Sequence, residues 1–93
     1  MRTIERSTRF KRDYKREMKG RHRATLDADL VALLVALAAD EPLDPRYVDH
    51  GLSGTWAGYR DCHVKPDLVL IYGKPDDDTL QLARLGSHSE LFG

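Results

Sequence analysis

Acidic, basic and histidine side chains are concentrated in one short segment of the chain. Residues 59–67 read YRDCHVKPD, and the five residues after them, LVLIY, are apolar or aromatic. A second segment, residues 84–88, reads RLGSH and ends in another histidine, His88. Because the unperturbed pKa of histidine is about 6.5, these side chains suit proton transfer near neutral pH. The two segments therefore predict general acid–base chemistry beside a buried strand.

Several of these polar side chains also have structural interpretations, which the sequence leaves open. Asp61 suits an ion pair with Lys65 about as well as it suits catalysis. Arg84 fits either a structural ion pair or the binding of a phosphate, whose geometry a guanidinium matches. His63 fits an ordinary position in a sheet, and Asp67, after a proline, fits the start of a turn.

Two helices are predicted before these segments. Phe10, Tyr14 and Met18 recur at helical spacing and predict a helix over about residues 9–19, with one apolar stripe. The segment at about residues 24–39 is rich in Ala and Leu and predicts a second helix, which ends ahead of two prolines. A short turn separates the two helices, so we expect them to pack as a hairpin.

The remainder of the chain predicts a loop and then an antiparallel meander. The loop covers about residues 41–54 and contains His50. The predicted strands lie at about residues 55–65, 68–74 and 79–85, with a further edge strand at residues 2–6. The predicted fold class is α+β: an N-terminal helical hairpin packed on a small antiparallel β-sheet, in a single domain over residues 1–93.

Composition and charge restrict the class of protein. Hydrophobic residues make up 41% of the 93, and no apolar run approaches the roughly 18 residues that span a bilayer. With one cysteine, Cys62, no internal disulfide can form. These features predict a cytoplasmic protein without a membrane contact. Residues 1–23 carry ten Lys and Arg against three Asp and Glu, a net charge of +7, whereas the rest of the chain carries −7. The basic part fits a polyanion or an acidic protein as its partner, and it fits an ordinary solvated surface helix equally well.

The motifs resemble the YafQ subgroup of the RelE/ParE toxin superfamily. The resemblance lies in residues 59–72 and in residues 84–92, RLGSHSELF. Residues 10–16, FKRDYKR, and the histidine before GLSG at residues 51–54 fit the same family. Such paired motifs are long and extend over nearly the whole chain, which makes them more specific than a lone short motif.

The resemblance implies the toxin of a bacterial toxin–antitoxin pair. Such toxins are ribosome-dependent endoribonucleases that cut mRNA in the A site of the 70S ribosome and stop translation. The RNA 2′-hydroxyl attacks its adjacent phosphate, giving a 2′,3′-cyclic phosphate and a free 5′-hydroxyl, with no metal or other cofactor. A DinJ-like antitoxin is the implied partner, and operator DNA is contacted only through the antitoxin complex. The family's functional positions fall on His50, Asp61, His63, Asp67, His88 and Phe92.

In-line phosphoryl transfer requires a base for the 2′-hydroxyl, an acid for the 5′-oxygen and positive charge near the phosphate. We expect His88, close to Gly86, to be the general acid. His63 or Asp67 is the expected base, and His50 orients the phosphate or shares the proton transfer. The same histidines and acids include metal-ligand types, but their spacing matches no compact ligand motif, so we expect no metal site.

RNA binding is expected from the remaining residues. Arg84 is the expected phosphate clamp, and Phe92 either stacks on a base or packs against the fold. The basic face of the first helix is expected to meet ribosomal RNA, the antitoxin or both; it carries Lys11, Arg12, Lys15 and Arg16. The alternative function is a non-catalytic, ParE-like inhibitor or binding module of the same fold. The histidines favour the nuclease, because a binding module does not need them to converge.

Overall fold

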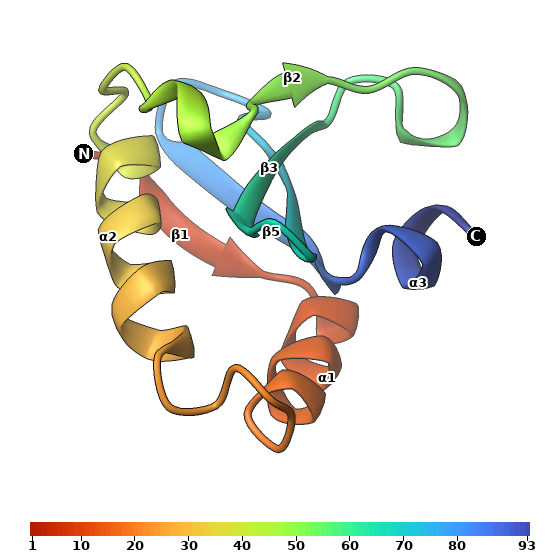
Figure 1. The fold of residues 1–93 in the computed structure, drawn as a ribbon. Helices are drawn as coiled ribbons and strands as arrows, with labels where there is room; N and C mark the ends of the chain where they lie inside the picture. The colour runs from red at the N-terminus through yellow and green to blue at the C-terminus, as the bar shows by residue number, and fades with distance from the viewer.

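The chain forms one five-stranded mixed sheet with two helices on one face and a short third helix at the other, as the computed structural model of residues 1–93 shows (Figure 1). The elements follow one another as β1 (Thr3–Arg6), α1 (Thr8–Glu17), α2 (Leu26–Ala38), β2 (His50–Gly51), β3 (Arg60–Lys65), β4 (Leu68–Gly73), β5 (Thr79–Gly86) and α3 (His88–Phe92), with 3₁₀ turns at Pro45–Tyr47 and Gly54–Trp56. The strand order is β1-β5-β4-β3-β2. The predicted α+β class is confirmed. None of the helices is long and apolar enough to cross a membrane.

The structure corrects several predicted boundaries. The sheet is mixed because β1 pairs in parallel with β5, while the other pairs are antiparallel. The first strand of the meander begins at Arg60 and not near residue 55, because a 3₁₀ turn and Gly58, with a φ of 90°, precede it. The predicted loop contains a two-residue strand, β2, and the C-terminal helix α3 was not predicted at all.

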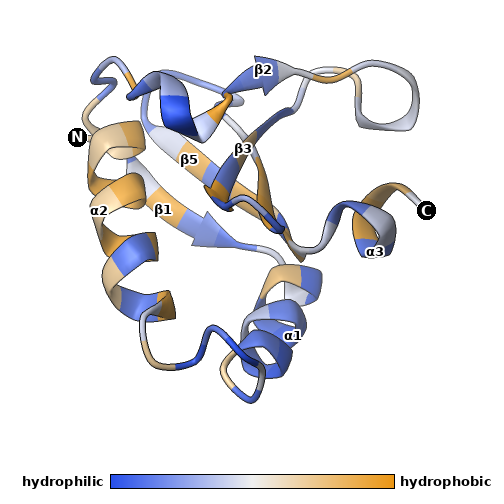
Figure 2. Cartoon of the chain, viewed as in Figure 1, coloured by the Kyte–Doolittle hydropathy of each residue, from blue (hydrophilic) through white to orange (hydrophobic).

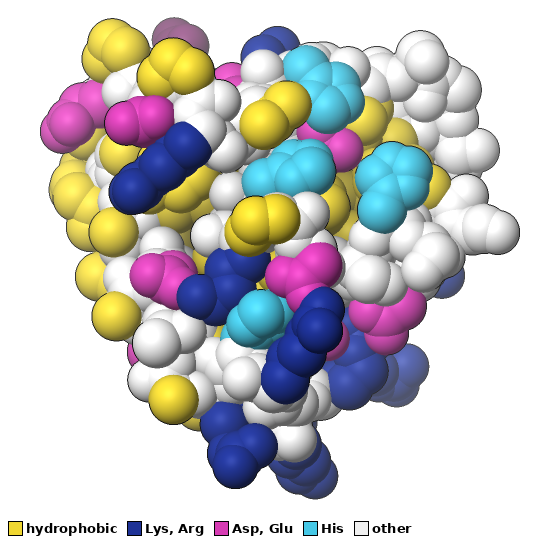
Figure 3. Space-filling model, in the orientation of Figure 1, with side chains coloured by type: hydrophobic (Ala, Val, Ile, Leu, Met, Phe, Trp, Pro, Cys, Tyr) yellow, Lys and Arg dark blue, Asp and Glu magenta, His cyan; other side chains and the backbone are white.

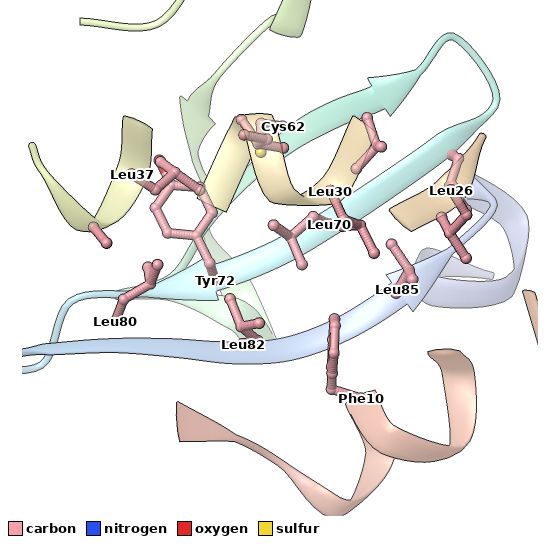
Figure 4. Packing of buried hydrophobic residues seen from close by; sticks show 14 residues of the cluster. Phe10, Leu26, Leu30, Leu37, Cys62, Leu70, Tyr72, Leu80, Leu82 and Leu85 are labelled. Carbon is pink, nitrogen blue, oxygen red and sulfur yellow. The ribbon is translucent and has the colours of Figure 1, made fainter. Parts of the chain in front are cut away.

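The main core lies between the sheet and helices α1 and α2. The predicted stripe of α1 is confirmed, since Phe10 is buried and Tyr14 and Met18 pack against the same cluster. The buried leucines of α2 recur at intervals of three or four residues, as Leu26, Leu30, Leu33 and Leu37. Figure 4 shows Leu26, Leu30 and Leu37 packed beside the strands. Burial of such a side chain contributes about 1.5–3 kcal/mol. In Figure 2, α1 is mostly hydrophilic on its visible surface, whereas α2 is largely hydrophobic.

A smaller cluster covers the opposite face of the sheet. Val69 and Ile71 of β4, Ala83 of β5 and Leu91 of α3 are buried together there. All six residues of β4 are buried, as predicted for a central strand that is covered on both faces. The candidate catalytic groups of β3 lie on this second face, away from α1 and α2.

Two irregularities in the strand pairing determine which face of the sheet Lys65 and Arg84 occupy. The register shifts between His63 and Lys65, and again beside Ala83. Such a bulge changes which face the following side chain occupies. Lys65 consequently pairs with Asp29 of α2, its Nζ lying 2.5 Å from Oδ2, so the alternative pairing with Asp61 is wrong.

Asp13 joins α1 to the end of β5. Its carboxylate is 3% exposed and accepts hydrogen bonds from Arg84 Nε at 2.7 Å, Leu85 N at 3.0 Å and Arg16 Nη1 at 2.9 Å. Burial opposes its ionisation, but the hydrogen bonds from Arg84 and Leu85 outweigh burial and lower the pKa of Asp13. The guanidinium of Arg84 is therefore held by a structural ion pair.

Asp13→Asn is expected to lower the free energy of unfolding by about 3–5 kcal/mol at neutral pH, because Arg84 loses its buried partner. Since the folded-state pKa of Asp13 is lowered, its contribution is present above the unfolded pKa of about 4 and is lost as the pH falls further. Thermal unfolding at pH 7 and pH 3 measures both effects. Asp77→Asn, in the turn before β5, is the control, and equal melting of the two variants at pH 7 would contradict this role.

Candidate active site

The buried carboxylate of Asp61, on β3, is the centre of the candidate site. Its side chain is 2% exposed, and Oδ1 has no aligned hydrogen-bond donor. Burial is the largest influence and raises the pKa of Asp61, whereas the charges of His50, His63 and His88 act to lower it. Histidines from β2, β3 and α3 are therefore close enough for their charges to act on one carboxylate. Figure 3 shows histidine side chains gathered on one face of the molecule, with acidic side chains among them.

His50 lies opposite Asp61 in the pairing of β2 with β3. Its Nδ1 is 2.9 Å from the carbonyl oxygen of Val48 and 3.0 Å from Oδ1 of Asp61. The carbonyl is aligned for a hydrogen bond, and the carboxylate is close without being aligned. Both neighbours are acceptors, so Nδ1 carries a hydrogen and the neutral ring keeps its lone pair on Nε2. His50 is thus oriented as a base.

The segment before His50 is held by an unusual backbone and by Asp49. Val48 has a φ of 50°, a left-handed conformation that is costly for a β-branched residue and that occurs mostly at functional sites. The Asp49 carboxylate accepts hydrogen bonds from the Tyr72 hydroxyl at 2.6 Å and from Arg60 Nη2 at 3.2 Å. Sequence reasoning missed Asp49, because a loop has no periodicity that shows which of its side chains point inward.

His63 and His88 complete the group from two further elements. His63 is half-buried and shares the face of β3 with Asp61, two residues away. His88 is the exposed first residue of α3. The centroid of the Phe92 ring lies 4.7 Å from the centroid of the His88 ring. Phe92 therefore packs against the fold at the candidate site, where it was also expected to stack on a base. Phe92 packs on the catalytic candidate and is still 36% exposed.

A capping box fixes the start of α3 and therefore the position of His88. Ser87 N donates to Glu90 Oε1 at 2.8 Å, and Glu90 N donates to Ser87 Oγ at 3.1 Å. Leu91 anchors the other side of the helix in the small cluster. The pattern Ser-x-x-Glu at residues 87–90 is a known signal for a helix start, so the sequence contained the information that was overlooked.

Gly86 allows this helix to approach α1. A Cβ at this position would lie 2.9 Å from Arg16 Nη2 and 3.3 Å from Leu91 Cδ2. Arg16 donates from Nη2 to the carbonyl oxygen of Leu85 at 2.8 Å and lies 3.4 Å from Glu90 Oε2 through Nε. The head group of Arg16, which was expected to bind RNA, is therefore engaged in joining α1, β5 and α3.

The structure does not bring every predicted site residue into this group. Asp67 contacts Arg21 and also His22, whose Nε2 is 2.9 Å from Oδ1. His22 was not singled out from the sequence, since nothing in its segment indicated a partner 45 residues away. Arg84 is held by Asp13, as described above. Of the four basic residues of α1 that were expected to bind RNA, Lys11, Arg12 and Lys15 are exposed and make no ion pair, whereas the head group of Arg16 is engaged.

No group of three or more His, Cys, Asp or Glu side chains is arranged to hold a metal ion. The site therefore consists of a buried acid, the surrounding histidines and one aromatic ring. These groups can take up and release protons at neighbouring points, which is the requirement of in-line transfer without a covalent intermediate.

Comparisons with known proteins agree with this fold. A family model described as the bacterial toxin of a type II toxin–antitoxin system, YafQ, matches residues 2–93. The mRNA interferase toxin YafQ of Escherichia coli K12 is 43% identical over 92 residues, which is 97% of this chain and 99% of that protein. A copper-bound mutant toxin from Helicobacter pylori has a TM-score of 0.87 and 42% identity, over 99% of this chain and 100% of its own. The E. coli DinJ–YafQ complex gives a TM-score of 0.84 at 40% identity, with 100% of both chains covered.

Matches of this extent place the chain among the toxins of bacterial type II toxin–antitoxin systems. Within that class, the chain belongs to the YafQ family. The family predicted from the paired motifs is thereby confirmed.

Asp61→Asn is expected to raise the melting temperature at pH 7. The folded-state pKa of Asp61 is raised, so the wild type loses stability as the pH rises through the ordinary aspartate range near 4 toward that raised value. A neutral side chain avoids this loss, and the difference should vanish at pH 3, where the carboxyl is protonated. Thermal unfolding at both pH values, with Asp77→Asn as control, measures it. A lower melting temperature for Asp61→Asn at pH 7 would contradict the unfavourable burial.

Proposed function

We propose that the chain is an mRNA interferase, a ribosome-dependent endoribonuclease that cuts mRNA in the A site and stops translation in the cytoplasm. One observation carries the proposal: His50 lies 3.0 Å from the buried carboxylate of Asp61, and the charges of His63 and His88, from two further elements, act on the same carboxylate. The names of the E. coli relatives, mRNA interferase toxin YafQ, support the same substrate.

In the proposed mechanism, His50 is the general base. Nε2 takes the proton of the RNA 2′-hydroxyl, and the new imidazolium is stabilised by Asp61, whose Oδ1 lies 3.0 Å from Nδ1. The 2′-oxygen then bonds to the adjacent phosphorus. This assignment departs from the expected base, His63 or Asp67. Asp67 is engaged with His22 and Arg21, and His50 is the histidine whose Nδ1 lies beside both the Val48 carbonyl oxygen and Oδ1 of Asp61.

His88 is the general acid that completes the step. As the bond from phosphorus to the 5′-oxygen breaks, the imidazolium of His88 donates its proton to that oxygen, leaving a 2′,3′-cyclic phosphate and a 5′-hydroxyl. His88 is exposed, so solvent can return the proton for the next cycle. His63 contributes positive charge near the phosphate oxygens when protonated, and Phe92 offers its exposed ring to a base. No metal or other cofactor takes part in these steps.

The free cations of α1 are the proposed foothold on ribosomal RNA. Lys11, Arg12 and Lys15 are exposed, in contrast to the engaged head groups of Arg16 and Arg84. A cationic helix face of this kind attracts phosphates independently of sequence. The expected set of RNA-binding residues on α1 is thus reduced to three.

We further propose a DinJ-like antitoxin as the protein partner. An apolar groove of about 220 Å³ lies between β1, α1 and α2, and Val31 beside it is 60% exposed. Such exposed apolar surface is typical of a protein interface. The E. coli relative is found in a complex with DinJ. Operator DNA would be contacted only by the complex of the two proteins.

Toeprinting of a translated mRNA tests the proposed activity. Wild type should produce A-site cleavage, and His88→Ala should reduce it by about 10²–10⁴-fold, the usual contribution of a general acid. Ser89→Ala, on the same helix, is the matched control and should cleave like wild type. Equal cleavage by His88→Ala would refute the acid assignment, and no cleavage by wild type would favour the non-catalytic, ParE-like alternative.

A further inference from the structure

A cleft of about 520 Å³ adjoins the histidine cluster, and His63 lines it. The 3₁₀ turn at Pro45–Tyr47 forms one side, and the end of β3 with the following turn forms another. Val48, Val64 and Pro66 provide its apolar surface. The volume lies within the range of about 300–1,000 Å³ that is common for small-ligand sites. Of this lining, the proposed mechanism uses only His63 and the carbonyl oxygen of Val48, which orients His50.

The polar groups of the cleft are arranged as two pairs. The guanidinium of Arg46 lies over the ring of Tyr47, 4.9 Å from its centroid, and donates to the Tyr47 hydroxyl at 2.9 Å. Lys65 Nζ lies 2.5 Å from Asp29 Oδ2. The first pair brings a guanidinium and an aromatic ring together, and the second places a donor beside an acceptor.

These features fit a nucleobase better than a phosphate. Asp29 pairs with Lys65, and Arg46 donates to Tyr47, so the cations of the cleft are engaged with neighbouring side chains and are not free to clamp a phosphate. Single-stranded RNA is commonly bound with its bases turned outward, stacked on aromatic rings or guanidinium planes, and read along their hydrogen-bonding edges. Every base presents donors and acceptors on that edge in its own order, so a fixed donor–acceptor pair can discriminate among bases.

We infer that this cleft is a base-binding subsite for the mRNA nucleotide next to the scissile phosphate. Arg46 and Tyr47 support the base, and the pair of Lys65 and Asp29 reads its edge. The subsite adjoins the reacting phosphate through His63 and thereby determines which sequences are cut. The inference rests on the proposed ribonuclease function.

Sequencing the ends of cleaved transcripts from a translating extract tests the subsite. Lys65→Met should change the base preference at one fixed position beside the cut by about fivefold, as expected when one hydrogen bond is lost. Arg46→Ala should change the preference at the same position, because the base is no longer held against Lys65 and Asp29. Lys74→Met is the matched control: its Nζ also pairs with an aspartate that follows α2, Asp40, at 2.6 Å, but it lies outside the cleft. It should keep the wild-type preference.

The possible failures are distinguishable. Cleavage by both cleft variants with the wild-type preference at every position would overturn the subsite and leave the nuclease intact. Complete loss of cleavage by both variants, with unchanged thermal unfolding, would also overturn it, because a base-reading subsite alters preference and not chemistry. No cleavage by the wild type would overturn the proposed function and the subsite together.

Discussion

The carboxylate of Asp61 is buried on β3 without an aligned donor, and a charge in such a place is costly unless opposite charges face it. His50, His63 and His88 provide those charges when they are protonated. The same arrangement couples the protonation of these groups, because protonation of one histidine changes the electrostatic potential at Asp61. A residue that weakens the fold at neutral pH is therefore also the residue that organises the candidate chemistry, a trade-off common in active sites.

The rest of the molecule positions the three histidines around this carboxylate. β4, buried on both faces, gives β3 a rigid neighbour. Asp49 ties the short β2 to β3 and β4 through Arg60 and Tyr72, which fixes His50. A capping box and the buried Leu91 fix α3 and with it His88. Helix α1 supports the same end of β5 through Asp13. The two large helices act mainly as the support of the opposite face, and the site itself is built on short elements.

The parts of the fold that were predictable are those with strong periodicity. The stripe of α1, the apolar α2 and the doubly buried β4 follow from the spacing and composition of their residues. The two bulges were not predictable, because an extra residue beside Lys65 or Arg84 leaves no mark in an alternating pattern. Consequently the partner suggested for Lys65, Asp61, was wrong, and the partner of Arg84 was left open. Asp13 is different: it follows Phe10 by three residues, so its place on the buried side of α1 was available from the sequence.

Among the site residues, the histidines and Asp61 were identified through the family motifs, and the structure joins them. Their roles depend on local geometry, which the sequence does not contain. The carbonyl oxygen of Val48 lies beside Nδ1 and orients His50 as the base. The position of this carbonyl depends on the left-handed backbone conformation of Val48 itself. Asp67 contacts His22, which lies 45 residues away in the sequence, and this contact engages one of the two expected bases.

Analysis of the ends of the cleaved mRNA tests the central claim most directly, because transfer by a histidine base and a histidine acid leaves characteristic groups. We predict a 2′,3′-cyclic phosphate on the upstream fragment and a 5′-hydroxyl on the downstream fragment, formed on ribosomes supplied with the purified protein. A 3′-hydroxyl with a 5′-phosphate would contradict attack by the RNA 2′-hydroxyl and with it the assigned roles of His50 and His88.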